Sequence, residues 1–335
     1  MIRKTALPVQ PPLRKSALAA SWPVYFAWTA CFCMLLLIFM GGLVTGFRAG
    51  MAVPDWPGTF GYNMVLYPLR KMTGGIFYEH SHRLLGLIAG LTTLALAILL
   101  TIRRRPLGAV FLIWTVAAGV AAQGIMGGLR VTENRPDLAV IHGFFAHLVL
   151  AGMVGVAVLL SRRRQMLQGQ TTCNKTDCLL SSLLVLGILL QTLLGTLVRQ
   201  MDIALLVHIT VAMFVILLAV VVGVRLWGLY PHIRVFARGG VALITIVVVQ
   251  LFLGGISLAV RTPPAVESPS AEQLQSQAAL QPAMHALITT LHQTTAAVLL
   301  GLATLLAVWC WRLVSISVAK EEAIDPETAM AGRDA

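Results

Sequence analysis

Eight long apolar runs dominate the sequence. Each is close to the roughly 20 residues that a helix needs to cross a bilayer. They lie near residues 24–46, 82–101, 107–129, 139–160, 179–198, 204–224, 239–260 and 285–311. Backbone amides cannot stay unpaired in lipid, and the runs are too long for the strands of a membrane barrel. The sequence therefore predicts an all-α polytopic membrane protein with eight transmembrane helices.

The composition excludes other classes of protein. Apolar residues make up 58% of the chain and charged residues 11%, whereas an ordinary soluble domain is about 25% charged. A soluble enzyme and a disordered protein are therefore excluded. The first run is too long for the core of a signal peptide, so we expect a retained span. The five cysteines include no C-x-x-C pair, which indicates neither a zinc site nor a redox dithiol.

Basic residues set the expected orientation. The net charge is +12, but the lysines and arginines form short clusters between the apolar runs, which favours contact with anionic lipid over nucleic acid. Seventeen of the 25 lie in the two termini and in the connections near 103–105, 162–175 and 225–238. The positive-inside rule then predicts a multi-pass protein of the inner (plasma) membrane with both termini in the cytoplasm. Connections 47–79 and 262–283 would lie outside, and the second, rich in Ser, Pro, Gln and Ala, is expected to be partly disordered.

An internal repeat divides the runs into four helical hairpins. Each odd-numbered run ends in one glycine or a pair of glycines, here called the glycine step, followed by an arginine. Each even-numbered run begins with a histidine. The arginines are Arg48, Arg130, Arg199 and Arg261, and the histidines are His82, His142, His208 and His292. The repeat predicts two pseudo-symmetric four-helix bundles, residues 1–165 and 166–335, with the histidines at the outer ends of their helices.

The repeated histidines indicate heme ligation. A single histidine in a membrane helix is often an interhelical hydrogen-bond donor, but four at one repeated position favour a metal or heme site. Zinc would be expected to recruit cysteine or carboxylate ligands, whereas heme iron needs two axial nitrogens. The residue four positions after each histidine is small, leaving room for a flat ring: Gly86, Ala146, Ala212 and Ala296. His285 is followed by Thr289, so His292 is preferred as the fourth ligand.

Charged residues beside the histidines have two interpretations each. The four repeated arginines would bind heme propionates through charge-assisted bonds, or they extend to lipid headgroups. Glu79 lies three residues before His82, on the same helix face. Its carboxylate would move protons or stabilise positive charge on a substrate, or it would only satisfy amides at a helix start.

These motifs resemble those of the heme A synthase family over residues 25–312. The segments that carry the resemblance are Gly41-Gly42-Leu43-Val44-Thr45, Pro54-Asp55-Trp56-Pro57, Glu79-His80-Ser81-His82-Arg83, Gly127-Gly128-Leu129-Arg130, Ile141-His142-Gly143, Gln191-x-x-x-Gly195-x-x-x-Arg199, and the helix starts at His208 and His292. Many members carry a cysteine pair in the first outer loop. Loop 47–79 has none, so the chain resembles the cysteine-less members.

The resemblance implies an oxidoreductase that makes heme A for cytochrome oxidase. It would oxidise the C8 methyl of heme O to a formyl group by successive hydroxylations. Substrate heme O would lie between His82 and His142 with Glu79 essential, and a cofactor heme b between His208 and His292. Heme O synthase and cytochrome oxidase assembly factors are the implied partners, and a homo-oligomer stays an open alternative.

Two other functions stay open. A non-catalytic diheme membrane cytochrome would transfer electrons, and bis-histidine ligation favours it because a six-coordinate iron has no open position for oxygen. Glu79 favours the enzyme, since an electron carrier needs no carboxylate beside its heme. A transporter would explain the repeats, but the sequence lacks paired broken helices with polar residues at the midplane.

Overall fold

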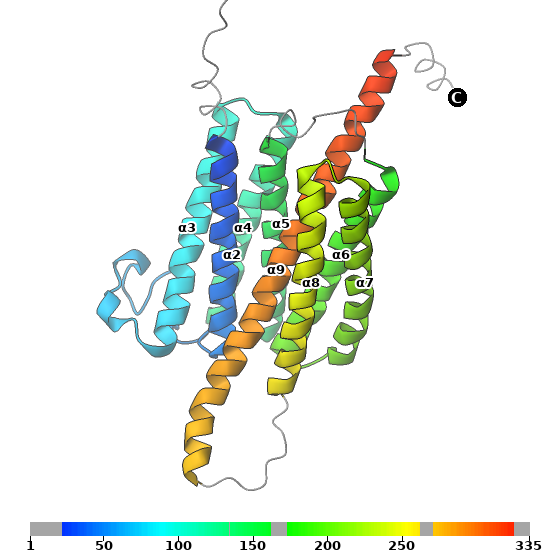
Figure 1. Cartoon of the computed structure of the whole chain (residues 1–335). Coiled ribbons are helices and arrows are strands. Elements are labelled where there is room, and N and C mark those ends of the chain that lie inside the picture. Colours follow the sequence, from blue (N-terminus) through cyan, green and yellow to red (C-terminus); the bar gives the residue numbers. More distant parts are fainter. Residues whose placement is uncertain (1–21, 134, 162–172, 262–270, 325–335) are drawn as a thin grey trace, which may run out of the picture.

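The structure is a computed structural model that describes residues 22–133, 135–161, 173–261 and 271–324, without the side chains of 136, 261, 271–282 and 315–324. Its α-helices, labelled in Figure 1, are α2 (Trp22–Gly46), α3 (Gly74–Ile102), α4 (Leu107–Glu133), α5 (Pro136–Leu160), α6 (Lys175–Met201), α7 (Leu205–Leu229), α8 (Arg234–Arg261) and α9 (Ala271–Ile324). Two short 3-10 helices, η1 (Met64–Leu66) and η2 (Leu69–Lys71), lie between α2 and α3. Eight helices of the described chain are long and apolar enough to cross a membrane. The predicted all-α, eight-span fold is confirmed.

Two helices, α3 and α9, begin well before the residues at which hydropathy predicts their start. α3 begins at Gly74 rather than near 82, so Glu79 and His80 belong to the helix and not to the preceding loop. Both side chains are buried, because the connection from α2 folds over them. α9 begins at Ala271, so part of the connection predicted to be disordered is helical. Residues 262–270 of that connection lie outside the described residues.

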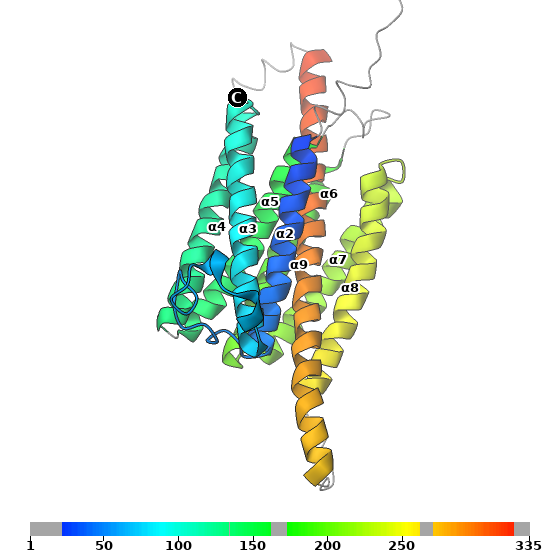
Figure 2. The same cartoon turned by 90° about the vertical axis from the view of Figure 1, so that its left-hand side faces the viewer.

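The helices pack as two rings of four that share a long boundary. In the first ring α2 packs on α3 and α5, and α4 closes the ring between α3 and α5. In the second, α6 packs on α7 and α9, and α8 lies between α7 and α9. α9 crosses the middle of the molecule and contacts α2 and α5 of the first ring (Figures 1 and 2). The domain boundary at 165/166 stays a prediction.

Small residues bring α2 and α9 close together. A Cβ added at Gly42 would lie 2.7 Å from Cγ2 of Thr290, and one added at Gly46 would lie 2.8 Å from Cβ of Ala286. This is the small-xxx-small packing expected between membrane helices. Gly42 and Gly46 therefore join the two rings.

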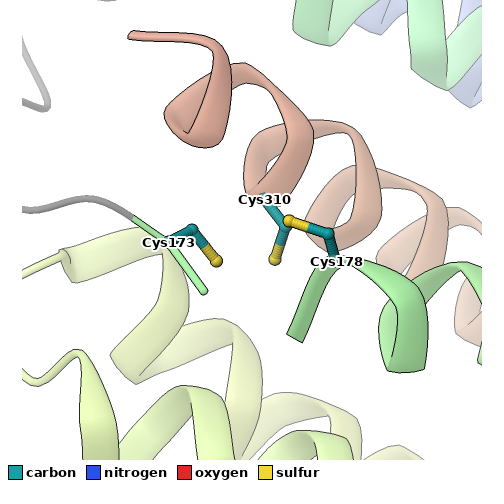
Figure 3. A group of neighbouring side chains, drawn as sticks. All are labelled: Cys173, Cys178 and Cys310. Carbon is teal, nitrogen blue, oxygen red and sulfur yellow. The ribbon is translucent and has the colours of Figure 1, made fainter. Parts of the chain in front are cut away.

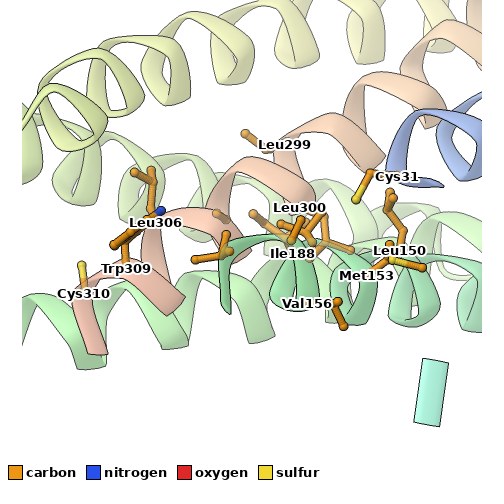
Figure 4. Packing of buried hydrophobic residues seen from close by; sticks show 14 of the residues in the cluster. Cys31, Leu150, Met153, Val156, Ile188, Leu299, Leu300, Leu306, Trp309 and Cys310 are labelled. Carbon is orange, nitrogen blue, oxygen red and sulfur yellow. The ribbon is translucent and has the colours of Figure 1, made fainter. Parts of the chain in front are cut away.

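The shared boundary is also the apolar core. Figure 4 shows Leu300 of α9 near Ile188 of α6 and Met153 of α5, with Leu306 further along α9 beside Trp309, and all of these side chains are buried. The outer faces of α7 and α8 are apolar as well, with Phe214 69% exposed and Phe252 68% exposed. Apolar surface of that extent is stable against lipid but not against water. The bundle therefore buries α9 and presents α7 and α8 to the membrane.

Candidate functional site

The four repeated histidines form two facing pairs. The rings of His82 (α3) and His142 (α5) lie 6.4 Å apart between centroids, at an interplanar angle of 74°. The rings of His208 (α7) and His292 (α9) lie 6.5 Å apart at 79°. The ring that faces His208 is thus that of His292, the ligand preferred over His285. Each ring of four helices contains one pair.

A glycine of the preceding helix lies against each histidine ring. An added Cβ would lie 3.0 to 3.3 Å from the ring carbon Cε1 in all four cases: Gly41 at His82, Gly127 at His142, Gly195 at His208 and Gly254 at His292. That distance is tighter than ordinary van der Waals contact, so an alanine would displace the ring. The glycine steps of the repeat therefore set the position of the histidines.

Three glutamines of the repeat also contact the histidines. Each lies one helical turn before the glycine that packs on the histidine ring. Gln123 Nε2 donates to the carbonyl of His142 at 3.0 Å, and Gln191 Nε2 donates to the carbonyl of His208 at 2.8 Å. Gln250 Nε2 lies 3.4 Å from Nε2 of His292. The matching position of the first hairpin, four residues before Gly41, is Leu37. His82 therefore lacks the amide that accompanies the other three histidines.

The two pairs fit a metal between two imidazoles. Half of the 6.4 Å centroid separation is 3.2 Å, the span of a metal–nitrogen bond of about 2 Å plus the radius of an imidazole ring. Within the described residues, Nδ1 of His82, His142 and His292 is buried without a hydrogen-bond partner. A buried polar atom left unpaired costs free energy, and a group bound between the rings would offset that cost. The donor sets fit two bis-histidine hemes.

Glu79 is held between the N-terminal histidine pair and the connection 47–73. Its Oε2 accepts a hydrogen bond from the backbone N–H of Val53 at 2.8 Å, and its Oε1 pairs with the Arg83 guanidinium at 2.8 Å. Glu79 is 3% exposed. The contacts fix a charge-assisted pair one helical turn from His82.

Arg83 anchors the Pro-Asp-Trp-Pro loop. Besides Glu79, its guanidinium donates to the carbonyls of Val53, Asp55 and Gly58 at 2.6 to 2.9 Å. Burial of Asp55 opposes its ionisation, but N–H bonds from Gly61 and Phe60 outweigh that effect and lower the pKa of this carboxyl. Arg83 had no role predicted from the sequence. Its position four residues after Glu79, the spacing of a helical ion pair, was the available signal.

The same loop packs on α4 and α3. The indole of Trp56 lies against Gly128, where an added Cβ would be 2.4 Å from its Cδ2. His80 is buried, with Nδ1 3.1 Å from Oγ1 of Thr59, and its ring lies 5.1 Å from that of Tyr67. The two glycines of Gly127-Gly128 therefore have separate contacts, one with a histidine and one with the loop.

The four repeated arginines differ in their surroundings. Arg48 is exposed in a left-handed turn after α2, and Arg130 lies against Gly50, where an added Cβ would be 2.2 Å from its guanidinium. Arg199 donates to the carbonyl of Gly42 at 2.7 Å and to Gln293 at 2.5 Å, which joins α6 to α2 and α9. The side chain of Arg261 lies outside the described residues. Their binding of propionates stays a prediction.

Three cysteines that lie far apart or unrelated in the sequence come together at the opposite end of the bundle from the histidine pairs. The thiols of Cys173, Cys178 and Cys310 are buried within 4.8 Å of one another (Figure 3). Their spacing along the chain gave no signal, because Cys310 comes from α9, Cys178 from the first turn of α6 and Cys173 from the segment before it.

Comparison with known proteins places the chain in a family. Residues 24–210 match the model of the COX15-CtaA family, described as cytochrome oxidase assembly protein. The match includes Glu79, His82, His142 and His208 but ends before His292, whose pairing with His208 is seen in the ring geometry. No curated protein is similar enough to the chain to count as a match. Because the family model covers more than half of the sequence, the chain belongs to the heme A synthase family of cytochrome oxidase assembly proteins.

Proposed function

We propose that the chain oxidises the C8 methyl of heme O to a formyl group through successive hydroxylations and so produces heme A. The observation that carries the proposal is the Glu79–Arg83 pair, held one helical turn from a histidine pair in a family of heme A synthesis. In this proposal His82 and His142 bind the iron of substrate heme O. His208 and His292 bind a resident heme b.

Glu79 acts as a fixed negative charge. Its two oxygens already accept hydrogen bonds from Val53 and Arg83, which hold the carboxylate in one orientation. Removing electrons from a ring methyl develops positive charge at that carbon, and a preorganised anion in a low-dielectric site stabilises it. The contacts thus favour electrostatic stabilisation over proton abstraction as its main role.

The loop above the pair orients the substrate and excludes water. Trp56, seated on Gly128, and the Arg83-bound carbonyls keep the loop over the first ring of helices. Arg130, beside Gly50, is the cation placed to pair with a propionate. A resident heme b, when bound, supplies one-electron transfer. The chain lies in the inner membrane with both histidine pairs near the outer face.

A diheme electron carrier is the second candidate, because the two pairs have nearly equal separations. Co-expression with a heme O synthase in a host that lacks heme A separates the two functions. Extracted hemes are identified by mass. We expect heme A together with a hydroxylated precursor. Heme O alone, from membranes in which the protein still carries heme b, would exclude the enzyme and favour the carrier.

A further inference from the structure

The cytoplasmic end proposed for the bundle contains a buried group of three thiols unrelated to the histidine pairs. Cys173 precedes α6, Cys178 is in its first turn, and Cys310 lies on α9. Their exposures are 5%, 0% and 0%, and all three are free thiols. Figure 3 shows the three side chains converging from two helices and the segment before α6. We propose that Cys173, Cys178 and Cys310 form a binding site for a single Cu(I) ion.

The ligand type selects a soft metal ion. Thiolates favour Cu(I), zinc and iron–sulfur clusters, whereas carboxylates and water favour harder cations. Three sulfur atoms around one ion at about 2.3 Å each lie about 4 Å apart in a trigonal plane. The observed sulfur atoms lie within 4.8 Å of one another, so small side-chain rotations bring them to that geometry. Each thiol that binds the ion gives up its proton.

The number of ligands favours Cu(I) over zinc. Structural zinc sites almost always have four ligands, and the group found in the described chain offers three. The nearby carboxylate of Asp177 is committed elsewhere: Arg225 Nε donates to its Oδ1 at 2.6 Å, and the Tyr230 hydroxyl donates to its Oδ2 at 2.6 Å. A three-sulfur site suits an ion that accepts low coordination.

The surrounding contacts hold the ligands in place before any ion binds. The Tyr230 hydroxyl accepts the backbone N–H of Asn174 at 3.0 Å, which fixes the residue next to Cys173. Asn174 also caps α6, since its side chain accepts from the N–H of Thr176 at 2.9 Å. Ser181 Oγ lies 3.8 Å from Sγ of Cys310. Such outer contacts orient metal ligands.

The test is a Cu(I) titration of the full chain, purified in detergent under anaerobic, reducing conditions, against a chromophoric Cu(I) chelator. We expect one Cu(I) per chain. The triple variant Cys173→Ala, Cys178→Ala, Cys310→Ala should lose it, with affinity lower by more than about 100-fold. The chain has two further cysteines, so the matched control is the double variant Cys31→Ala, Cys33→Ala, which should bind as the parent does. Equal binding by the triple variant, or loss in the control, would overturn the proposal.

Two measurements on the unaltered chain keep the test valid if the variants do not fold. X-ray absorption of the chain loaded with one equivalent of Cu(I) should show sulfur ligands only. Nitrogen or oxygen ligands around the copper would refute the site. Preferential binding of Zn(II) by the same thiols in competition would show that the metal is misassigned.

Discussion

The two rings of helices hold histidine pairs of nearly the same geometry under different surroundings. Centroid separations are 6.4 Å in the first ring and 6.5 Å in the second, and a glycine lies against every histidine. The first pair is adjacent to Glu79, Arg83 and a folded loop of the connection 47–73. In the second ring α6 and α7 are joined by residues 202–204 alone. The repeat therefore provides two equivalent histidine pairs, and the connection 47–73 gives the first pair surroundings that the second does not share.

The largest expected effect comes from a substitution of Glu79, which lies in the first ring of helices only. Glu79→Gln keeps the size of the side chain but removes its charge, so heme A production should fall by about 10²–10³. The heme b spectrum should be unchanged, because Glu79 lies in the other ring. Heme A is measured by mass in the co-expression host. Glu133→Gln at the exposed end of α4 is the matched control, and a Glu79→Gln variant with parental output would remove the proposed role.

The next effect concerns the resident heme. His292→Ala removes one ligand of the second pair, so heme b should be lost or its iron should become high-spin. His82→Ala should leave that optical spectrum intact, since its ring faces His142 instead. The measurement is the absorption and electron paramagnetic resonance spectrum of the purified chain. Equal loss of heme b in both variants, with folded protein, would contradict two independent sites.

A smaller change tests the glycines. Gly254→Ala would place a Cβ 3.1 Å from the His292 ring, so the ring must move at a cost of about 1–3 kcal/mol. We expect a shifted heme b spectrum with retained heme. Gly255 has no atom within 4 Å of an added Cβ among the described residues, so Gly255→Ala serves as control. An identical spectrum in Gly254→Ala would show that the glycine does not set the ring position.

The orientation test should leave both hemes unaffected. Leu69→Cys in η2 is 78% exposed at the end near the histidine pairs. Arg104→Cys lies in the turn at the other end of α3. Both variants are made in a Cys33→Ala background. An impermeant thiol reagent applied to spheroplasts should label Leu69→Cys more strongly than the parent. It should label Arg104→Cys only in inverted vesicles. The reverse pattern would place the end of the bundle that holds the histidine pairs on the cytoplasmic side.

The sequence by itself determined the eight spans, the four hairpins and the histidines that repeat in them. Each of these signals is local. Lipid requires a long apolar helix for every crossing, and a histidine at the start of each even run is visible within its own segment. The family resemblance rested on the same short motifs, and the match over residues 24–210 confirmed it.

The tertiary structure alone decided which groups meet across long distances in the chain. Hydropathy placed the start of α3 too late because the polar residues of its first turns are satisfied by the loop and not by water, as Arg83 binding to the carbonyl of Val53 shows. The pairing of His208 with His292, and the meeting of Cys178 with Cys310, depend on where α9 crosses the bundle. The periodicity of apolar residues indicates that a face of a helix is buried. The partner of each face is set by close contacts such as Gly46 against Ala286, because only packing at that distance selects one neighbour among many apolar helices.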